Sequence, residues 1–166
     1  MKNDTISILK QAILLERRGK AFYTQVAGKS DTPAVKNFFE TMAAEEDHHE
    51  IILSEQYKAF QHHGKFIPTT LPENEAEKTA SRILTADLRG KITAAGFEAA
   101  AISAAMSLEE RSIRIYSDQA KQTDDPQEKA VYQWLAAWES RHLDLLSRLD
   151  RELTEAIWND NSFWPY

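Results

Sequence analysis

The feature that most constrains this chain is an internal repeat, in which each unit begins 93 residues after its counterpart. Two stretches carry the same four polar residues at the same spacing. The first set is Glu16, Tyr23, Glu46 and His49. The second set is Glu109, Tyr116, Glu139 and His142. A repeat of this length indicates a duplicated structural unit, and here each copy holds one lone glutamate followed by a Glu-x-x-His motif.

Four long stretches have apolar residues at helical spacing, and this pattern predicts four helices. They cover about residues 5–27, 33–62, 93–121 and 126–153. Thr32 and Pro33 fit the N-cap and the first helical position of the second helix. Each repeat unit is therefore a helical hairpin, and neither hairpin can bury its apolar stripe alone.

Two hairpins packed face to face give an all-α four-helix bundle. The connection between them has to cross the length of the bundle, which is the single long crossover of ferritin-like folds. We expect one domain over residues 1–166. Its parts are a first hairpin (about 3–63), a crossover (about 64–92, with a short polar helix near 73–88), a second hairpin (about 93–153) and an aromatic C-terminal tail (154–166). The tail is expected to cover the bundle end or a dimer interface.

The overall composition excludes several kinds of function. A net charge of −6 argues against binding to nucleic acid, which needs a basic face. The absence of cysteine excludes disulfides, thiolate catalysis and iron–sulfur clusters, so oxygen and nitrogen must hold any metal. There is no apolar run of about 18 residues that would span a membrane, and the N-terminus has no signal-peptide pattern. A cytoplasmic protein is expected.

The repeated polar residues have the spacing of metal ligands. Glu46 and His49 are three residues apart on a predicted helix, so they share one face, and the second copy repeats this pair. All lie on the apolar stripes, where an ionised carboxylate without a partner costs several kcal/mol. Two divalent cations would balance four carboxylates, and one imidazole per metal suits iron or manganese. The predicted ligands are Glu16, Glu46, His49, Glu109, Glu139 and His142.

The ligands are expected to have two roles. Glu46 and Glu139 are the predicted bridging carboxylates, because their rigid pairing with histidine aims them at the shared midpoint. Glu16 and Glu109 are the predicted terminal ligands.

Two tyrosines lie seven residues after the lone glutamates and nearly on the same helix face. Since a buried phenol needs a partner, we expect Tyr23 and Tyr116 each to donate a hydrogen bond to a ligand carboxylate of the other hairpin.

Other polar residues near these motifs have simpler interpretations. Surface or helix-pairing charges are predicted for Glu45, Glu50, Glu55 and Glu110. Glu98 is predicted to be a partly buried structural group rather than a ligand, and His48 is expected to face outward.

Three segments carry a resemblance to a known family. They are Glu-Arg-Arg-Gly-Lys-Ala-Phe-Tyr (16–23), Phe-Phe-Glu-Thr-Met-Ala-Ala-Glu-Glu-Asp-His-His-Glu (38–50) and Glu-Glu-Arg-Ser-Ile-Arg-Ile-Tyr (109–116). The chain resembles the rubrerythrin branch of the ferritin-like superfamily over roughly residues 3–153. The resemblance implies a non-haem di-iron centre that reacts with hydrogen peroxide or dioxygen, with the six residues above as ligands and manganese as the other metal to consider.

The chain departs from that family in two ways. Rubrerythrins proper have a four-cysteine rubredoxin iron site that supplies electrons, and this chain has no cysteine. Electrons are therefore expected from a separate electron-donor protein. Rubrerythrins also use an extra carboxylate on the third long helix, for which Glu98 and Glu110 are the nearest candidates.

The expected activity is that of a rubrerythrin-like oxidoreductase, of peroxidase or ferroxidase type, which reduces hydrogen peroxide or dioxygen at a di-iron site. We expect a homodimer that binds neither nucleic acid nor membrane. Two alternatives stay open at this point. One is an iron-binding or storage protein whose ferroxidase step only loads metal, and the other is a metal-stabilised interaction scaffold.

Overall fold

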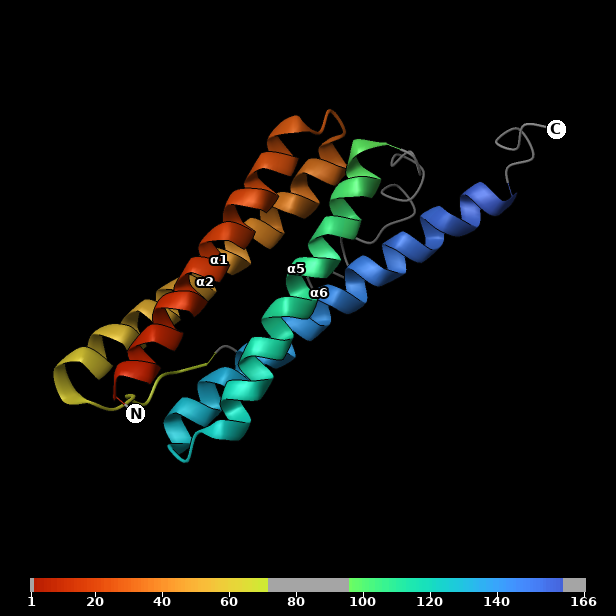
Figure 1. Cartoon of the computed structure of the whole chain (residues 1–166). Helices are drawn as coiled ribbons and strands as arrows, with labels where there is room; N and C mark the ends of the chain where they lie inside the picture. The colour runs from red at the N-terminus through yellow and green to blue at the C-terminus, as the bar shows by residue number, and fades with distance from the viewer. Residues whose placement is uncertain (1, 72–95, 160–166) are drawn as a thin grey trace.

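A computed structural model describes residues 2–71 and 96–159, and this part of the chain forms four long α-helices and no strands (Figure 1). They are α1 (Lys2–Lys29), α2 (Pro33–His63), α5 (Phe97–Gln122) and α6 (Pro126–Asn159). The predicted all-α class is confirmed. The short helix expected near 73–88 and the last seven residues of the aromatic tail lie outside the described residues. None of the described helices has the length and apolar character needed to cross a membrane.

The helices pair as two antiparallel hairpins, α1 with α2 and α5 with α6, and α1 also packs beside α5 (Figure 1). Helix α2 ends at one end of the bundle, whereas α5 begins at the other end, so these two helices run in the same direction (Figure 1). The end of α2 and the start of α5 therefore lie at opposite ends of the bundle. This arrangement is the expected ferritin-like four-helix bundle, made of two hairpins and one long crossover.

Local sequence signals account for both ends of α2. Thr32 takes the N-cap position of α2 and Pro33 the first helical position, as predicted. Helix α2 ends at His63, and Gly64 takes the C-cap position. The positive φ of Gly64, 67°, suits glycine, and its N–H donates to Phe60 O at 2.9 Å.

The second hairpin differs from the expected bounds at two points. Helix α5 begins at Phe97, a few residues after the expected start near residue 93, because the backbone of Gly96 is extended (φ −88°, ψ −179°) and caps the helix. Helix α6 continues to Asn159, beyond the expected end near residue 153.

The apolar core has two separate clusters with a polar layer between them. Along α1, Leu9 and Ala12 belong to one cluster and Tyr23 and Val26 to the other, while Glu16 lies between. The same order occurs along α6, where buried residues 131–135 and 145–153 flank a polar segment. The two clusters thus separate the polar layer from water at both ends of the bundle.

Candidate metal centre

The polar layer contains all six residues that the sequence identifies as ligands. Glu16 comes from α1, Glu46 and His49 from α2, Glu109 from α5, and Glu139 and His142 from α6. Each has at most 4 % of its surface exposed. Buried acidic residues are rare unless they are paired, so the fold concentrates four carboxylates and two imidazoles where they need partners.

These side chains form two overlapping groups that share two members. One oxygen or nitrogen atom from each of Glu16, Glu46, His49 and Glu139 lies within 4.8 Å of the others. The same holds for Glu46, Glu109, Glu139 and His142. The shared residues, Glu46 and Glu139, are the two that the sequence analysis assigns as bridges.

The histidine rings direct one nitrogen into this layer. His49 Nδ1 lies 3.2 Å from Glu16 Oε2 and 3.0 Å from Glu139 Oε1. His142 Nδ1 lies 3.1 Å from Glu139 Oε2 and 3.7 Å from an oxygen of Glu109. Glu139 therefore lies between the two rings, with one oxygen facing each.

The layer leaves buried polar atoms without hydrogen-bond partners. Both carboxylate oxygens of Glu139 lie at ion-pair distance from a histidine Nδ1 atom, but neither they nor His142 Nδ1 make a hydrogen bond there, and His49 Nε2 also has no hydrogen-bond partner. Leaving such atoms unpaired costs about 1–3 kcal/mol each, and in native proteins they usually have a partner. Oxygen and nitrogen donors in this number and arrangement fit divalent cations such as iron or manganese, and the cluster has the composition of a metal site.

The protonation behaviour of the layer reflects its crowded negative charge. Burial raises the pKa of Glu46, and the charge of Glu139 raises it further. Burial and Glu139 also raise the pKa of Glu109 to about 7. Burial acts to raise the pKa of Glu139 as well, but His49 and His142 more than offset it and hold this pKa below its ordinary value. Protons or cations are needed to relieve the repulsion among these groups.

Both predicted tyrosine hydrogen bonds are present. Tyr23 donates to Glu109 Oε1 and Tyr116 donates to Glu16 Oε1, so each phenol reaches the lone glutamate of the other hairpin. Burial, together with the nearby carboxylates, raises the pKa of both phenols above its ordinary value. The tyrosines thus stay protonated and keep donating.

One contact with the clustered residues was not foreseen by the sequence analysis. Glu45, predicted as a surface or helix-pairing charge, is half-buried and accepts hydrogen bonds from His142 Nε2 and Trp138 Nε1. Of the two predicted alternatives, a surface charge or a helix-pairing charge, these contacts support the second, because Glu45 lies where α2 faces α6. The repeat itself held a signal, since the equivalent position in the second copy is the large apolar residue Trp138.

The other polar residues lie outside the two groups. Glu110 is exposed, and Glu98 is half-buried and accepts a hydrogen bond from Ser30 Oγ at 3.3 Å, as befits a structural group. His48 is exposed, as predicted. Among the described residues, neither candidate for an extra carboxylate belongs to the cluster.

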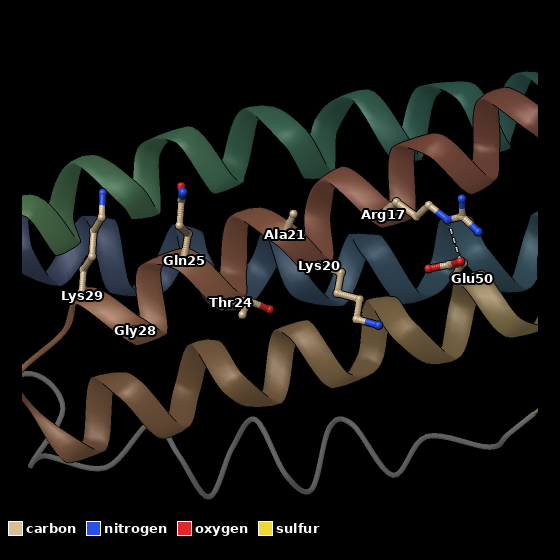
Figure 2. A pocket seen from close by; sticks show the side chains of 8 residues that line it. All are labelled: Arg17, Lys20, Ala21, Thr24, Gln25, Gly28, Lys29 and Glu50. Atoms are coloured by element: carbon tan, nitrogen blue, oxygen red, sulfur yellow. Dashed lines mark hydrogen bonds and ion pairs between the residues drawn. The ribbon is translucent and has the colours of Figure 1, made fainter.

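An open depression of about 730 Å³ runs along α1, and none of the six clustered residues lines it (Figure 2). Figure 2 shows Arg17 reaching across to Glu50 of α2, at 2.7 Å. Lys20 is paired in turn with Asp47 at 2.5 Å. Since these basic groups already have acidic partners, the depression is a less convincing functional site than the buried layer.

Comparison with known proteins agrees with this geometry. The family model described as Rubrerythrin matches residues 7–150, which is most of the chain. Searches of curated proteins and of solved structures gave no match.

Proposed function

Because this chain belongs to the rubrerythrin family, we propose that it is a non-haem di-iron carboxylate protein that reduces hydrogen peroxide or dioxygen. The observation that carries the proposal is the pair of overlapping donor groups in the buried layer. Four carboxylates and two imidazoles on four helices are the ligand set of di-iron and di-manganese bundles.

Each residue of the layer has a proposed role. Glu46 and Glu139 belong to both groups and would bridge two metal ions, while Glu16 with His49 and Glu109 with His142 would complete the two ends. Two divalent ions would balance the four carboxylates and so offset the burial and the repulsion that raise the pKa of Glu46.

The proposed chemistry belongs to the metal ions. When bound, a pair of ferrous ions would supply the two electrons that, with two protons from the solvent, reduce one hydrogen peroxide to two water molecules, leaving two ferric ions. The protein's own part is to hold the ligands in place and keep bulk water away. Tyr23 and Tyr116 restrain the terminal carboxylates, and the two apolar clusters close the layer at both ends.

We propose that the electrons for re-reduction come from a separate protein, because the chain has no cysteine for a rubredoxin-type iron site of its own. This predicts that the oxidised protein turns over only when an external electron donor is supplied.

The proposal is tested by metal content and peroxide reduction together. Anaerobic loading with ferrous iron should give about two irons per chain, and each pair should be oxidised by one equivalent of peroxide, measured by optical spectroscopy. Glu46→Ala and Glu139→Ala should each abolish the paired site. Glu110→Ala, a change of the same charge at an exposed position, should leave both readouts unaltered.

Other outcomes separate the alternative functions. Many irons per chain in a large assembly would instead indicate storage. A loaded protein that never consumes peroxide or dioxygen would indicate a metal-stabilised scaffold.

A further inference from the structure

The two repeat units carry different residues at a position beside the polar layer. Glu45 of α2 and Trp138 of α6 are 93 residues apart, so they occupy equivalent positions in the two copies. They also contact each other, because Trp138 Nε1 donates to Glu45 Oε2 at 3.3 Å. The side chain of Glu45 is only 16 % exposed, and Trp138 is buried. The approximate two-fold symmetry that the ligands share with Tyr23 and Tyr116 therefore does not extend to this pair of positions.

On one side, Glu45 holds the ring of His142. His142 Nε2 forms a hydrogen bond with the same Glu45 oxygen. An ionised carboxylate can only accept, so Nε2 carries the proton and Nδ1 is the nitrogen left to face Glu139, at 3.1 Å. A carboxylate partner fixes the tautomer and orientation of a histidine ligand and makes it more basic.

On the other side, His49 has no such partner. Its Nδ1 atom faces Glu16 and Glu139, but its Nε2 atom is buried without a hydrogen bond. The ring instead packs nearly perpendicular to two indoles, with centroids 5.3 Å from Trp134 and 5.4 Å from Trp138. These contacts restrict the ring, but they provide no oxygen or nitrogen acceptor that would set its tautomer.

From this difference we propose that Glu45 is a positioning residue that makes the two metal positions unequal. The position formed with His142 binds a divalent ion more tightly than the position formed with His49. The proposal rests on the proposed function only in requiring that both positions bind metal. Its physical basis is that the His142 ring is already oriented and polarised by Glu45, whereas the His49 ring is not.

The test is a titration of the metal-free full chain with Co²⁺, followed by calorimetry and by the visible absorption of the bound ion. The wild type should bind two ions in two resolved steps. Glu45→Gln keeps the size of the side chain but removes its charge, and should weaken the tighter step by about tenfold or more, as losses of such partners do. The weaker step should change little, so the two steps approach each other.

Glu110→Gln is the matched control. It removes one negative charge from a residue adjacent to a proposed ligand, as Glu45→Gln does, but at an exposed position that is not hydrogen-bonded to His142. It should leave both steps at their wild-type affinities. Circular dichroism and melting of each metal-free variant would show that the fold is retained.

Trp138→Phe is a second, independent variant. It keeps a ring beside His49 but removes the N–H that Trp138 donates to Glu45. It should weaken the tighter step by less than Glu45→Gln does. A loss confined to the weaker step would contradict the proposed link through Glu45.

The location of the first ion completes the test. At one Co²⁺ per chain, paramagnetic shifts or anomalous diffraction should place the ion beside His142 rather than His49. Equal Co²⁺ affinities of the two positions in the wild type would overturn the proposed difference between them. Equal losses of affinity at both binding steps in Glu45→Gln would do the same. Either result would leave the proposed function unaffected. Failure of the wild type to bind Co²⁺ and ferrous iron at all would overturn both.

Discussion

At the scale of single residues, space beside the carboxylates is limited where α1 passes Glu46. A Cβ atom added at Gly19 would lie 3.3 Å from Glu46 Cδ and 3.4 Å from Cγ, whereas one added at Gly28, on the same helix, would meet nothing within 4 Å. Because Gly19 has no side chain, the Glu46 carboxylate can pack directly against α1.

We predict that Gly19→Ala weakens metal binding because Glu46 has to shift by a few tenths of an ångström. Gly28→Ala is the control, and should raise the free energy of unfolding by about 0.5 kcal/mol, since alanine favours a helix more than glycine does. Gly19→Ala should raise the free energy of unfolding by less than Gly28→Ala does. Thermal melting and a metal titration of both variants measure the two effects, and equal gains with unchanged metal affinity would show that Glu46 is not confined.

Residue-level prediction from the sequence worked where the repeat and the helical period agree. Both place Glu16 on the buried face of α1 and Glu46 with His49 on the buried face of α2, and their convergence with the second copy follows from two-fold packing. The partner of each tyrosine was predictable for the same reason. Glu45 was not, because its burial depends on how closely α2 approaches α6, and helical spacing within one helix does not contain that information.

At the scale of elements, the two hairpins begin their second helices differently. Asp125 precedes α6, and its Oδ1 atom accepts hydrogen bonds from the backbone N–H groups of Gln127 at 2.8 Å and Glu128 at 3.2 Å. The equivalent residue of the first copy, Thr32, occupies the N-cap of α2 but makes no capping hydrogen bond through its side chain. Equivalent positions thus make unequal contributions to helix stability.

We predict that Asp125→Ala lowers the free energy of unfolding by about 1 kcal/mol, the usual cost of losing an N-cap acceptor. Thr32→Ala should change it by much less, because no side-chain bond is lost. Urea denaturation of the two variants, followed by circular dichroism at 222 nm, measures the difference. Equal losses would mean that the Thr32 hydroxyl caps α2 in solution.

The helices themselves were predictable from apolar spacing, but their ends were less so. Helix α2 begins at Pro33 as its turn signal predicts. The start of α5 was placed too early because apolar residues continue through Gly96, and the extended conformation of that glycine outweighs them. The continuation of α6 to Asn159 had no stop signal to mark its end.

At the scale of the whole molecule, the buried layer links stability to pH. Without metal, the pKa of Glu109 rises from 4.5 to about 7, and the pKa values of Glu46, His49 and His142 rise as well. Groups with a raised pKa bind protons more tightly in the folded state. The stability that they contribute is present at low pH and is lost as the pH rises through the folded pKa.

We predict that the metal-free protein loses stability as the pH rises from about 4.5, the ordinary pKa of Glu109, to about 7, its raised pKa, while metal binding strengthens because its ligands must be deprotonated. Glu139, whose pKa is lowered, acts in the opposite sense, but only below its ordinary pKa and therefore outside this range. The melting temperature of the Mn²⁺-loaded protein should exceed that of the metal-free protein by an amount that grows with pH. Differential scanning calorimetry in the presence of Mn²⁺ or of a chelator measures the gap, and a gap that is constant or shrinks with pH would contradict the role of these carboxylates.

The contact between Glu45 and Trp138 also bears on the ancestry of the chain. If an ancestor was a pair of identical hairpins, both partners had the same residue at this position, and that residue faced its own copy. Only after the gene for the hairpin had been doubled and joined could each copy mutate alone. A glutamate opposite a tryptophan is therefore something that a single polypeptide can encode and that a symmetric pair of identical hairpins cannot.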